Sequence, residues 1–356
     1  MDKVLIKDIA EVVNGSTPST KENSYWDGNI PWITPKDLSA ISGRYISNGE
    51  RNITKEGYQS CSTTLVPKNT ILLTSRAPIG YLAIAKNDLC TNQGFKSLIC
   101  NQSRILPLYM FYWLSTKIEF LKSISGGATF KELSKTSLEN VVMDLPNIVQ
   151  QQHIVDTIGT VDSLIEFNQE KISKIKSLAT QKYEFLYKAY PKSAIGKRLK
   201  FIKGKQPKFV SKEDGLPYLV IDDLASNIYT QFSSEGLACD ENDVLMVMDG
   251  ASSGKVFTGN KGYVGSTLAK LSSSQIKSSI LYFGLSKFEE EIMKNTTGSA
   301  IPHTDKSFVS ELQIIDDLDG KTTDFFDFCL NQICNLRTQN FLLNIQKEIL
   351  LQKFFH

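Results

Sequence analysis

Two long segments of the chain carry apolar residues at alternating spacings of three and four. In the first segment, residues 153–190, Gly159 is the sole glycine or proline. Asn168 takes one position of an apolar series that otherwise reads Ile154, Ile158, Val161, Ile165, Ile172, Ile175 and Ala179. This heptad spacing predicts an α-helix of about 55 Å with a narrow apolar seam. Such a seam on a long helix requires a partner helix.

The C-terminal segment, residues 325–356, has a matching seam. Its apolar positions are Phe326, Cys329, Ile333, Leu336, Leu343 and Leu350. The simplest packing joins the two helices antiparallel, as a rigid spacer with one globular part at each end. The alternative is that each helix packs against the globular part beside it in the chain.

The remaining sequence favours short strands. Compact apolar runs at residues 70–75, 81–85, 141–146 and 244–248 are bounded by Gly, Pro or Asn, which is typical of buried strands. A helical stretch over residues 107–124 begins at Pro107, as a first helical turn allows. Because strands and helices do not alternate strictly, the pattern predicts an α+β fold.

Several segments recur along the chain in the same order. Residues 30–38 (IPWITPKDL) resemble residues 216–224 (LPYLVIDDL), 186 positions later. Residues 70–80 resemble 243–254, and residues 125–130 resemble 297–302 at a shift of 172. The two long helices match at a shift of 165. This common order indicates an internal duplication, and hence two similar globular domains related by a pseudo-two-fold repeat.

The predicted boundaries follow from this repeat. We expect a first domain, a central helix, a second domain and a C-terminal helix, at residues 1–146, 147–190, 191–320 and 321–356.

Composition narrows the class of protein. The chain contains no run of eighteen apolar residues, so a membrane-spanning helix is not expected. The N-terminus lacks the features of a signal peptide. Six cysteines show no Cys-x-x-Cys spacing and are interpreted as reduced thiols. The expectation is a cytoplasmic protein with no membrane partner.

Charge is unevenly distributed, although the net charge is only +2. Residues 171–208 hold twelve Lys or Arg and one acid, Glu184. Such a run suits a polyanionic partner, and a solvated helix face is the alternative.

Motifs for catalysis are absent from the sequence. There are three histidines, no His-Glu-x-x-His, and no His, Cys or Asp cluster with metal-ligand spacing. Residues 250–256 (GASSGKV) resemble a phosphate-binding loop, but the glycine spacing is one short and Val replaces the Ser or Thr that holds magnesium. No Gly-x-Ser-x-Gly elbow and no Gly-rich cofactor turn occur. These absences favour a binding protein that holds neither metal nor cofactor.

The repeated loops instead carry polar residues suited to DNA. Arg and Lys can reach phosphate or guanine, Asn and Gln can pair with adenine, and Ser, Thr and Gly allow close approach of the backbone to phosphate. The candidate DNA-binding residues are Ser16, Thr17, Lys36, Arg76, Asn92, Gln93, Gly126, Gly127, Thr129, Lys131, Lys203, Lys205, Gln206, Ser252, Ser253, Lys255, Ser299 and His303. For any one of them, a plain role in the loop is the competing interpretation.

The stretch from Asn14 to Leu38 mixes turn residues with large aromatic ones. Its IPWITPKDL end recurs in the second half, which indicates a shared frame, and its GSTPSTKENS end does not recur, as expected of a loop that varies with its ligand. Trp26 and Trp32 are interpreted as packing anchors of this frame, because large aromatic side chains are mostly buried.

The order of these motifs resembles the specificity subunits of type I restriction–modification systems. The resemblance rests on GSTPS…YWDGNIPWITPKDL, LLTSRAPIG, TNQGFKSL and SGGATFKELSKTSLENVVMDLP, followed by the helix QQHIVDTIGTVDSLIEFNQEKISKIK. It covers the whole first half. In the second half KGKQPKF replaces the Gly-Ser-Thr-Pro loop, and no Trp matches Trp26.

The resemblance implies two target-recognition domains, each reading one half of a split sequence in double-stranded DNA. The helices would set the spacing, with seam residues Ile158, Val161, Ile165, Ile172, Ile175, Ile333, Leu336, Leu343 and Leu350. They would also dock two methyltransferase subunits and the restriction subunits. Catalysis would then belong to these partners, which would carry S-adenosylmethionine, ATP and magnesium. The competing hypotheses are a two-lobed module that binds carbohydrate or another protein, and an enzyme whose site is assembled from loops.

Overall fold

The chain forms two compact units in a computed structural model. The first unit comprises Met1–Asp162 and Lys347–His356, and the second comprises Ser163–Gln346. The structure describes residues 2–39, 41, 43–127, 131–298, 300–316 and 318–355, without the side chain of Ala225. Each long helix is thus divided between the two units, whereas the sequence suggested boundaries at the helix ends.

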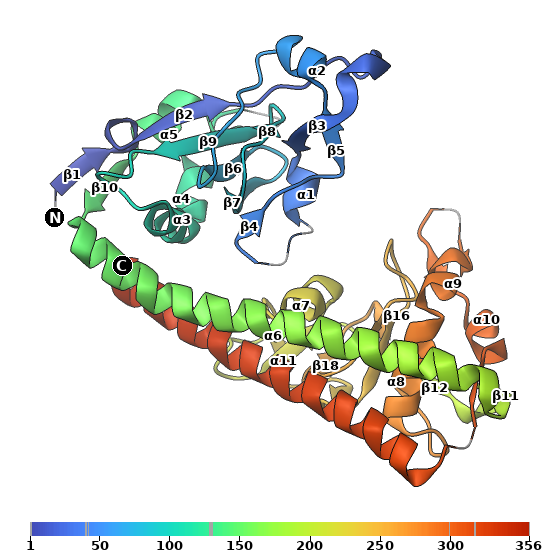
Figure 1. Cartoon of the computed structure of the whole chain (residues 1–356). Helices are drawn as coiled ribbons and strands as arrows, with labels where there is room; N and C mark the ends of the chain where they lie inside the picture. The colour runs from blue at the N-terminus through green and yellow to red at the C-terminus, as the bar shows by residue number, and fades with distance from the viewer. Residues whose placement is uncertain are drawn as a thin grey trace. The chain divides into compact units, whose positions relative to one another are not determined.

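The first unit contains mixed β-structure (Figure 1). A five-stranded sheet has the order β2-β9-β6-β7-β4, with bounds Ala10–Asn14, Phe95–Cys100, Ile71–Ser75, Ile79–Ala85 and Tyr45–Ile46. A three-stranded sheet has the order β5-β3-β8, at Arg51–Ile53, Trp26–Ile33 and Cys90–Thr91. A third sheet pairs β1 (Asp2–Leu5) with β10 (Val142–Leu145).

The second unit repeats this plan. One four-stranded sheet has the order β12-β19-β16-β17, at Lys200–Lys203, Leu268–Ser272, Val244–Val247 and Val256–Phe257. Another has the order β14-β13-β18-β15, at Phe232–Ser233, Leu216–Leu219, Gly262–Val264 and Ala238–Cys239. The two-stranded sheets are β11-β22 and β20-β21, at Lys192–Ala194, Gln313–Ile315, Thr296–Thr297 and His303–Thr304.

Helices complete both units. The first unit holds α1 to α5, at Pro35–Ser39, Lys55–Gln59, Pro107–Thr116, Ile118–Ser123 and Lys135–Glu139, and the short 3₁₀ turns η1 (Ile6–Asp8) and η2 (Asn23–Tyr25). The second unit holds η3 (Gly196–Arg198) and α7 to α10, at Ile221–Ser226, Ser278–Lys287, Glu289–Lys294 and Lys306–Glu311. The long helices are α6 (Ile148–Ala189) and α11 (Gly320–Phe355). The predicted helix over residues 107–124 is two helices, because the chain leaves the helical conformation at Lys117.

The predicted duplication is confirmed by strand order and by register. β2-β9-β6-β7 corresponds to β12-β19-β16-β17. In the first unit β3 pairs in parallel with β8, placing Trp32 opposite Cys90. In the second unit β13 pairs in parallel with β18, placing Tyr218 opposite Tyr263. Trp32 and Tyr218 are therefore equivalent, which is the predicted shift of 186.

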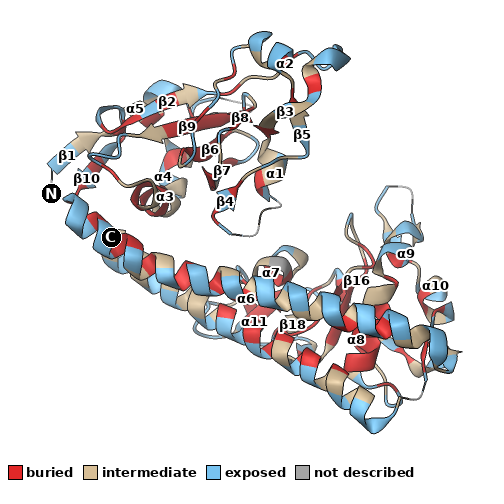
Figure 2. Cartoon of the chain, in the orientation of Figure 1, coloured by how far each residue is buried: buried red, intermediate tan, exposed pale blue. Residues whose placement is uncertain are grey.

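The seam of α6 is buried at Ile154, Ile158, Val161, Ile165 and Ala179 and partly buried at Ile172 and Ile175, and Figure 2 shows buried and exposed positions alternating along the helix. In the second unit, Ala179 and Tyr183 of α6 share one apolar cluster with Phe326 and Ile333 of α11. The same cluster contains Phe283 of α8 and other residues of the second globular part. The two packing arrangements considered in the sequence analysis therefore occur together. The long helices pack against each other, and they also pack against the globular part of the second unit.

A buried polar pair interrupts this apolar seam. Asn168 of α6 donates from Nδ2 to Oδ1 of Asn340 of α11 at 2.9 Å, and the two residues are 6% and 2% exposed. Repeat-related positions of α6 and α11 hold Ile175 and Ile333, so the repeat does not reproduce this pair. A polar pair buried in a coiled coil selects one register, because sliding by a heptad would leave both amides unpaired.

The end of α11 closes the core of the first unit. Leu350, Phe354 and Phe355 pack against the apolar cluster that includes Tyr109 of α3 and Ile154 of α6. The Tyr109 and Phe355 rings lie 5.4 Å apart. The N-terminal half of the chain thus completes its core with residues from the opposite end of the sequence.

A charged network anchors this closure. The buried carboxylate of Asp162 accepts a hydrogen bond from Tyr112 Oη at 2.7 Å, and Lys347 Nζ lies 2.7 Å from its other oxygen. Arg44 donates to the same Tyr112 hydroxyl at 3.0 Å. Burial, together with the Asp162 charge, raises the pKa of Tyr112, so its hydroxyl stays protonated and can donate. The network links α6, α11, α3 and the loop before β4.

No helix in the described part of the chain is long and apolar enough to cross a membrane. The six cysteines are all free. Burial raises the pKa of Cys239 to about 12, so its thiol is protonated and unreactive at neutral pH.

We expect Asn168→Leu to lower the free energy of unfolding by about 1–3 kcal/mol, because it leaves the buried Oδ1 of Asn340 without its donor. The double variant N168L/N340L should recover that loss, since two leucines restore an apolar seam. Urea unfolding monitored by circular dichroism measures both effects. Asn335→Leu, on an exposed position of α11, is the matched control and should change little. Equal destabilisation by the single and double variants would contradict the pairing argument.

Candidate nucleic-acid interface

The loops that follow β2 and β12 begin with a glycine that no other residue can replace without a shift of the backbone. A Cβ atom on Gly15 would lie 2.1 Å from the carbonyl oxygen of Asn92. A Cβ atom on Gly204 would lie 2.0 Å from the carbonyl oxygen of Val264. The two glycines are equivalent, and each is followed three positions later by a proline, Pro18 or Pro207.

This equivalence corrects one expectation. The Gly-Ser-Thr-Pro end of the first loop does recur, as Gly-Lys-Gln-Pro at residues 204–207. The sequence already placed KGKQPKF at this position, and the structure shows that the glycine and the proline are equivalent in the two loops. The close approach of the two backbones requires the glycine, and the residues between glycine and proline are free to differ.

Four predicted residues of the first unit come together around this glycine. Ser16 N donates to the carbonyl oxygen of Thr91 at 3.0 Å, and the Thr17 hydroxyl is hydrogen-bonded to the side chain of Gln93. The Asn92 carboxamide oxygen accepts from Gly94 N at 2.8 Å, which forms a local turn. Ser16, Thr17, Asn92 and Gln93 thus form one surface, although Asn92 also stabilises its own loop.

The two tryptophans hold this loop to the frame, as predicted. Trp26 and Trp32 are 4% and 6% exposed, and their rings meet edge to face at 5.1 Å. Trp32 Nε1 donates to the carbonyl oxygen of Ser16 at 3.0 Å, and Trp26 Nε1 donates to that of Ser19 at 3.1 Å. Both side chains therefore fix the loop backbone instead of facing a ligand.

Among the residues that the structure describes, Lys36 pairs with none of the four that form this surface. Its ammonium group pairs with Glu50 Oε2 at 2.7 Å, and both side chains are largely exposed. The hydrogen bond to Glu50 raises the pKa of Lys36. Lys36 is thus a cation on α1 whose carboxylate partner, Glu50, precedes β5.

A first cluster, Arg76, Lys96 and Glu132, lies where β6 ends. Glu132 Oε2 lies 3.7 Å from Arg76 Nη1, and its Oε1 lies 3.4 Å from Lys96 Nζ. Lys96 is buried, whereas the Arg76 side chain is 39% exposed. Gly126 and Glu132 exchange backbone hydrogen bonds of 3.2 and 2.8 Å, which bring the glycine turn to the cluster. Gly127 follows with φ of 111°, a conformation that favours glycine.

Two further predicted residues, Lys131 and Thr129, belong to the same segment of the chain. Lys131 is exposed beside Glu132. Thr129 lies outside the described residues.

A second cluster, Lys203, Asp249 and His303, lies where β16 ends. Asp249 Oδ2 accepts from Lys203 Nζ at 2.6 Å, and Asp249 Oδ1 lies 2.7 Å from His303 Nδ1. Burial opposes ionisation of Asp249, but the hydrogen bonds from Lys203 and His303 lower its pKa below the usual value. Asp249 is therefore an anion between two basic side chains at neutral pH.

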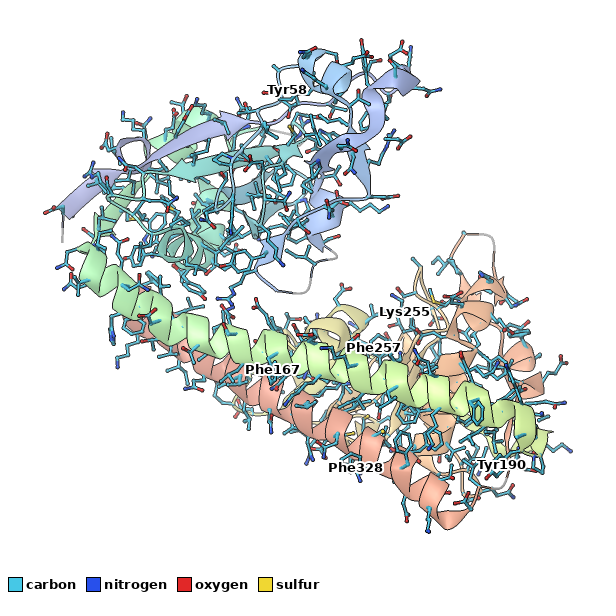
Figure 3. The ribbon with its side chains drawn as sticks, in the orientation of Figure 1. Tyr58, Phe167, Tyr190, Lys255, Phe257 and Phe328 are labelled. Carbon is cyan, nitrogen blue, oxygen red and sulfur yellow. The ribbon has the colours of Figure 1, made fainter. Side chains whose placement is uncertain are left out.

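A buried serine hydroxyl stabilises the turn beside this cluster. The Ser253 hydroxyl is buried, 2.7 Å from the carbonyl oxygen of Gly250 and 2.9 Å from that of Pro302. Ser252 and Lys255 (Figure 3) are partly exposed on the same turn. Lys205 and Gln206 are exposed in the loop after Gly204. Ser299 lies outside the described residues.

Sequence reasoning missed the carboxylates of both clusters. Glu132 and Asp249 were not chosen because an acid does not suggest contact with a phosphate. Position in the repeat could have identified one of them, because Asp249 precedes a glycine turn and aligns with Arg76 of the first half. Within the described residues, no group of three or more His, Cys, Asp or Glu side chains could hold a metal ion.

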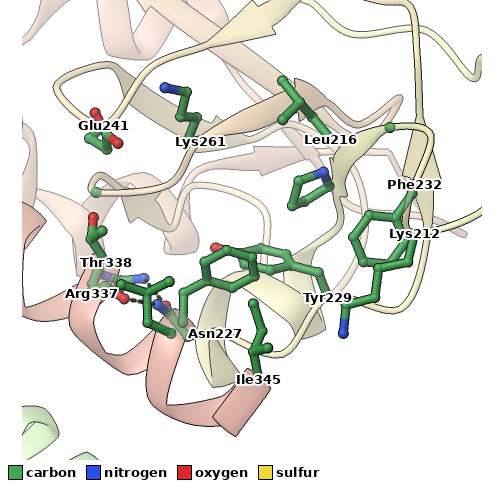
Figure 4. A pocket seen from close by; sticks show the side chains of 15 residues that line it. Lys212, Leu216, Asn227, Tyr229, Phe232, Glu241, Lys261, Arg337, Thr338 and Ile345 are labelled. Atoms are coloured by element: carbon green, nitrogen blue, oxygen red, sulfur yellow. Dashed lines mark hydrogen bonds between the residues drawn. The ribbon is translucent and has the colours of Figure 1, made fainter. Parts of the chain in front are cut away.

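An apolar pocket of about 340 Å³ lies elsewhere in the second unit, between β13, β14 and α11. Figure 4 shows Tyr229 and Phe232 on one side and Arg337 of α11 on another. Arg337 Nη1 donates to Asn227 Oδ1 at 3.0 Å, so its charge is used to tie α11 to the loop after α7. None of the predicted DNA-binding residues lines this pocket.

Comparison with known proteins gives these clusters a context. Residues 1–177 match the family model described as the type I restriction modification DNA specificity domain. The chain belongs to this family. The match ends within α6, so it includes the first globular part of the chain and most of the central helix.

Two relatives match a similar length of the chain. The chain is 49% identical over 181 residues to the type I restriction enzyme MjaIX specificity subunit of Methanocaldococcus jannaschii, a match spanning 50% of this chain and 42% of that protein. It is 28% identical over 185 residues to the EcoR124I/EcoR124II specificity subunit of Escherichia coli, spanning 50% and 45%. The matches therefore span less than half of each relative.

A solved structure extends the likeness in fold to the second half of the chain. The S subunit of the type I restriction–modification system from M. genitalium aligns with 100% of this chain and 96% of its own, at a TM-score of 0.53 and 17% identity. At this identity the likeness concerns the fold alone. It agrees with the α+β class and the two-domain repeat predicted from the sequence.

We expect Gly15→Ala and Gly204→Ala each to lower the free energy of unfolding by about 1–3 kcal/mol, because the added methyl group would overlap a backbone carbonyl oxygen. Thermal unfolding of the full chain measures this loss. Gly320→Ala is the matched control, since nothing lies within 4 Å of its Cβ position. If all three variants unfold alike, the close approach does not constrain the loop.

Proposed function

We propose that this chain is the DNA-reading subunit of a type I restriction–modification complex, with each unit reading one half of a bipartite duplex target. The observation that carries the proposal is the repeat. A chain of the specificity family contains two units of the same strand order, and each presents a charged cluster at the end of the same strand. Two equivalent reading surfaces suit a target with two half-sites.

The reading surface combines two kinds of contact. Exposed cations such as Lys131 and Lys205 supply attraction to phosphates, which is independent of sequence and falls with salt. Polar groups held on the frame, such as Gln93 and Arg76, supply contacts to base edges. A carbohydrate- or protein-binding module would lack a steep dependence of duplex binding on salt concentration, which separates it from this proposal.

The catalytic steps belong, in this proposal, to partner subunits. Methyltransferase subunits would carry S-adenosylmethionine, and restriction subunits would use ATP and magnesium. This chain would direct them to the target and bind no cofactor of its own.

The helix pair supports the docking of such partners. Leu164, Lys171, Leu178 and Phe185 follow one another at seven-residue spacing on α6, on a face distinct from the buried seam. Leu164, Leu178 and Phe185 are 46%, 58% and 74% exposed. Phe167 and Phe328 (Figure 3) add further exposed apolar side chains on α6 and α11. Exposed apolar stripes of this kind are typical of protein–protein interfaces.

The double variant L178S/F185S should reduce copurification of the methyltransferase subunit at least roughly tenfold, because it removes the two most exposed apolar side chains of the stripe. Its unfolding temperature should stay close to that of the wild-type chain, since both side chains face solvent. Gln181→Ser, on an exposed position between them, serves as the control. Normal copurification of the double variant would exclude this stripe as the docking face.

The helix pair also suits a ruler for the gap between half-sites. We expect one heptad inserted into α6 between Ile165 and Leu178, with a matching heptad in α11, to lengthen the pair by about 10 Å. That length corresponds to roughly three base pairs at 3.4 Å each. Both seams keep their register, because seven residues restore the same face.

Methylation mapping in cells that carry the complete system tests the function and the ruler together. The wild-type complex should methylate a bipartite sequence, and the lengthened one should methylate the same half-sites with a wider gap. A heptad in α6 alone, which misaligns Asn168 and Asn340, is the control and should abolish methylation. A single uninterrupted wild-type motif would overturn the proposed function, and an unchanged gap would overturn the ruler.

A further inference from the structure

The turns after β6 and β16 occupy the same place in the two units. Leu133 N donates to the carbonyl oxygen of Ser75 at 2.9 Å, and Thr304 N donates to that of Met248 at 2.9 Å. β6 lies between β9 and β7, and β16 lies between β19 and β17. The residues that follow Ser75 and Met248 are therefore equivalent. They are Arg76 in the first unit and Asp249 in the second.

The segment that faces each turn is equivalent as well. Glu132 precedes Leu133 and forms an antiparallel bridge with Gly126, whereas His303 precedes Thr304 and pairs with Thr297. The next residues of the opposing segments, Gly127 and Gly298, have φ of 111° and 92°. This pairing corrects the predicted shift of 172 to 171 and makes Glu132 equivalent to His303.

The lysine of each cluster comes from a different strand of the same strand pair. In the first unit β2 pairs with β9, and Asn14 lies opposite Lys96. In the second unit β12 pairs with β19, and Lys203 lies opposite Ala269. The lysine is therefore on β9 in one unit and on the neighbouring strand, β12, in the other.

The two units therefore share the same backbone arrangement, but the acidic and basic side chains at the turn and at the facing segment are reversed. Each cluster holds one carboxylate between two basic groups. In the first unit the turn is cationic and the facing segment is anionic, through Arg76 and Glu132. In the second unit the turn carries the carboxylate, Asp249, and the facing segment carries the basic group, His303.

A carboxylate at this position is informative, because it would repel a phosphate. Asp249 is only 21% exposed, and two basic groups hold it in place. What such a fixed acceptor can bind on DNA is the exocyclic amino group of a base, and the usual carboxylate partner is cytosine N4. The equivalent Arg76, 39% exposed, matches the acceptor edge of guanine.

We propose that this position after β6 and β16 reads one base pair in each half-site, with Arg76 selecting a guanine and Asp249 selecting a cytosine. The inference rests on the proposed function. Glu132 is then a positioning residue for Arg76, and Lys203 and His303 position Asp249. The reversal of polarity lets two copies of one frame read the two bases with complementary hydrogen-bonding edges.

The test uses the complete complex in cells, with methylation mapping of the wild type and of single variants. Arg76→Ala and Arg76→Lys should each relax one G·C pair of the first half-site roughly 10- to 100-fold and leave the second half-site unchanged. Lysine keeps the charge but lacks the two-pronged contact to guanine. Asp249→Asn should relax one G·C pair of the second half-site and favour adenine there, because Asn pairs with adenine.

Matched controls come from the equivalent helices α4 and α9. Lys122→Ala removes a cation that pairs with Glu119, and Glu290→Gln neutralises an exposed carboxylate that pairs with Lys294. Neither change should alter the motif. Copurification with the methyltransferase subunit verifies that each variant is folded.

Three outcomes would overturn the inference. The first is a wild-type half-site without any G·C pair. The second is a uniform loss of methylation across sequences, since that would make the position a phosphate contact or a purely structural one. The third is an unchanged motif in both Arg76 and Asp249 variants. A bipartite wild-type motif would leave the proposed function standing in the last two cases.

Discussion

The antiparallel pairing of α6 with α11 is the constraint on which the rest of the structure depends. In the second unit, Ala179 and Tyr183 of α6 belong to the same core as Phe326 of α11. In the first unit, Phe355 at the end of α11 packs on Tyr109, and Lys347 pairs with Asp162. Each core is therefore completed by a helix that begins in the other unit. Heptad seams tolerate slippage by seven residues, and the buried asparagine pair removes that freedom.

The two units share their backbone geometry around this helix pair but differ in the side chains that they present. The shared part is backbone geometry: the glycine that starts each loop, the parallel pairing of β3 with β8 and of β13 with β18, and the turns after β6 and β16. These features depend on close approach and hydrogen bonding of the main chain, so they survive wide divergence of side chains. The variable part is the charge carried at each position. A duplicated frame can in this way present two different surfaces.

Electrostatics explains why the charged clusters are compatible with binding a polyanion. A carboxylate flanked by two basic groups is held in one geometry and leaves the cluster with excess positive charge when both are protonated. The chain as a whole carries a net charge of only +2, so attraction to DNA would be local. Lys96 is buried, and Asp249 is held by Lys203 and His303, so the fold fixes these groups before any ligand arrives. Preorganised polar groups lose little entropy on binding.

The sequence by itself determined the heptad seams, the internal duplication and the burial of Trp26 and Trp32, and it favoured an antiparallel pairing of the two long helices. All of these follow from periodicity, composition or repetition, which are local properties of the chain. Only the tertiary structure decided which polar residues meet. His303 contacts Asp249 across 54 positions of sequence, and the equivalence of Gly204 with Gly15 rests on a close backbone contact. Such contacts depend on how strands pair and turns close, and no spacing of residues along the chain encodes them.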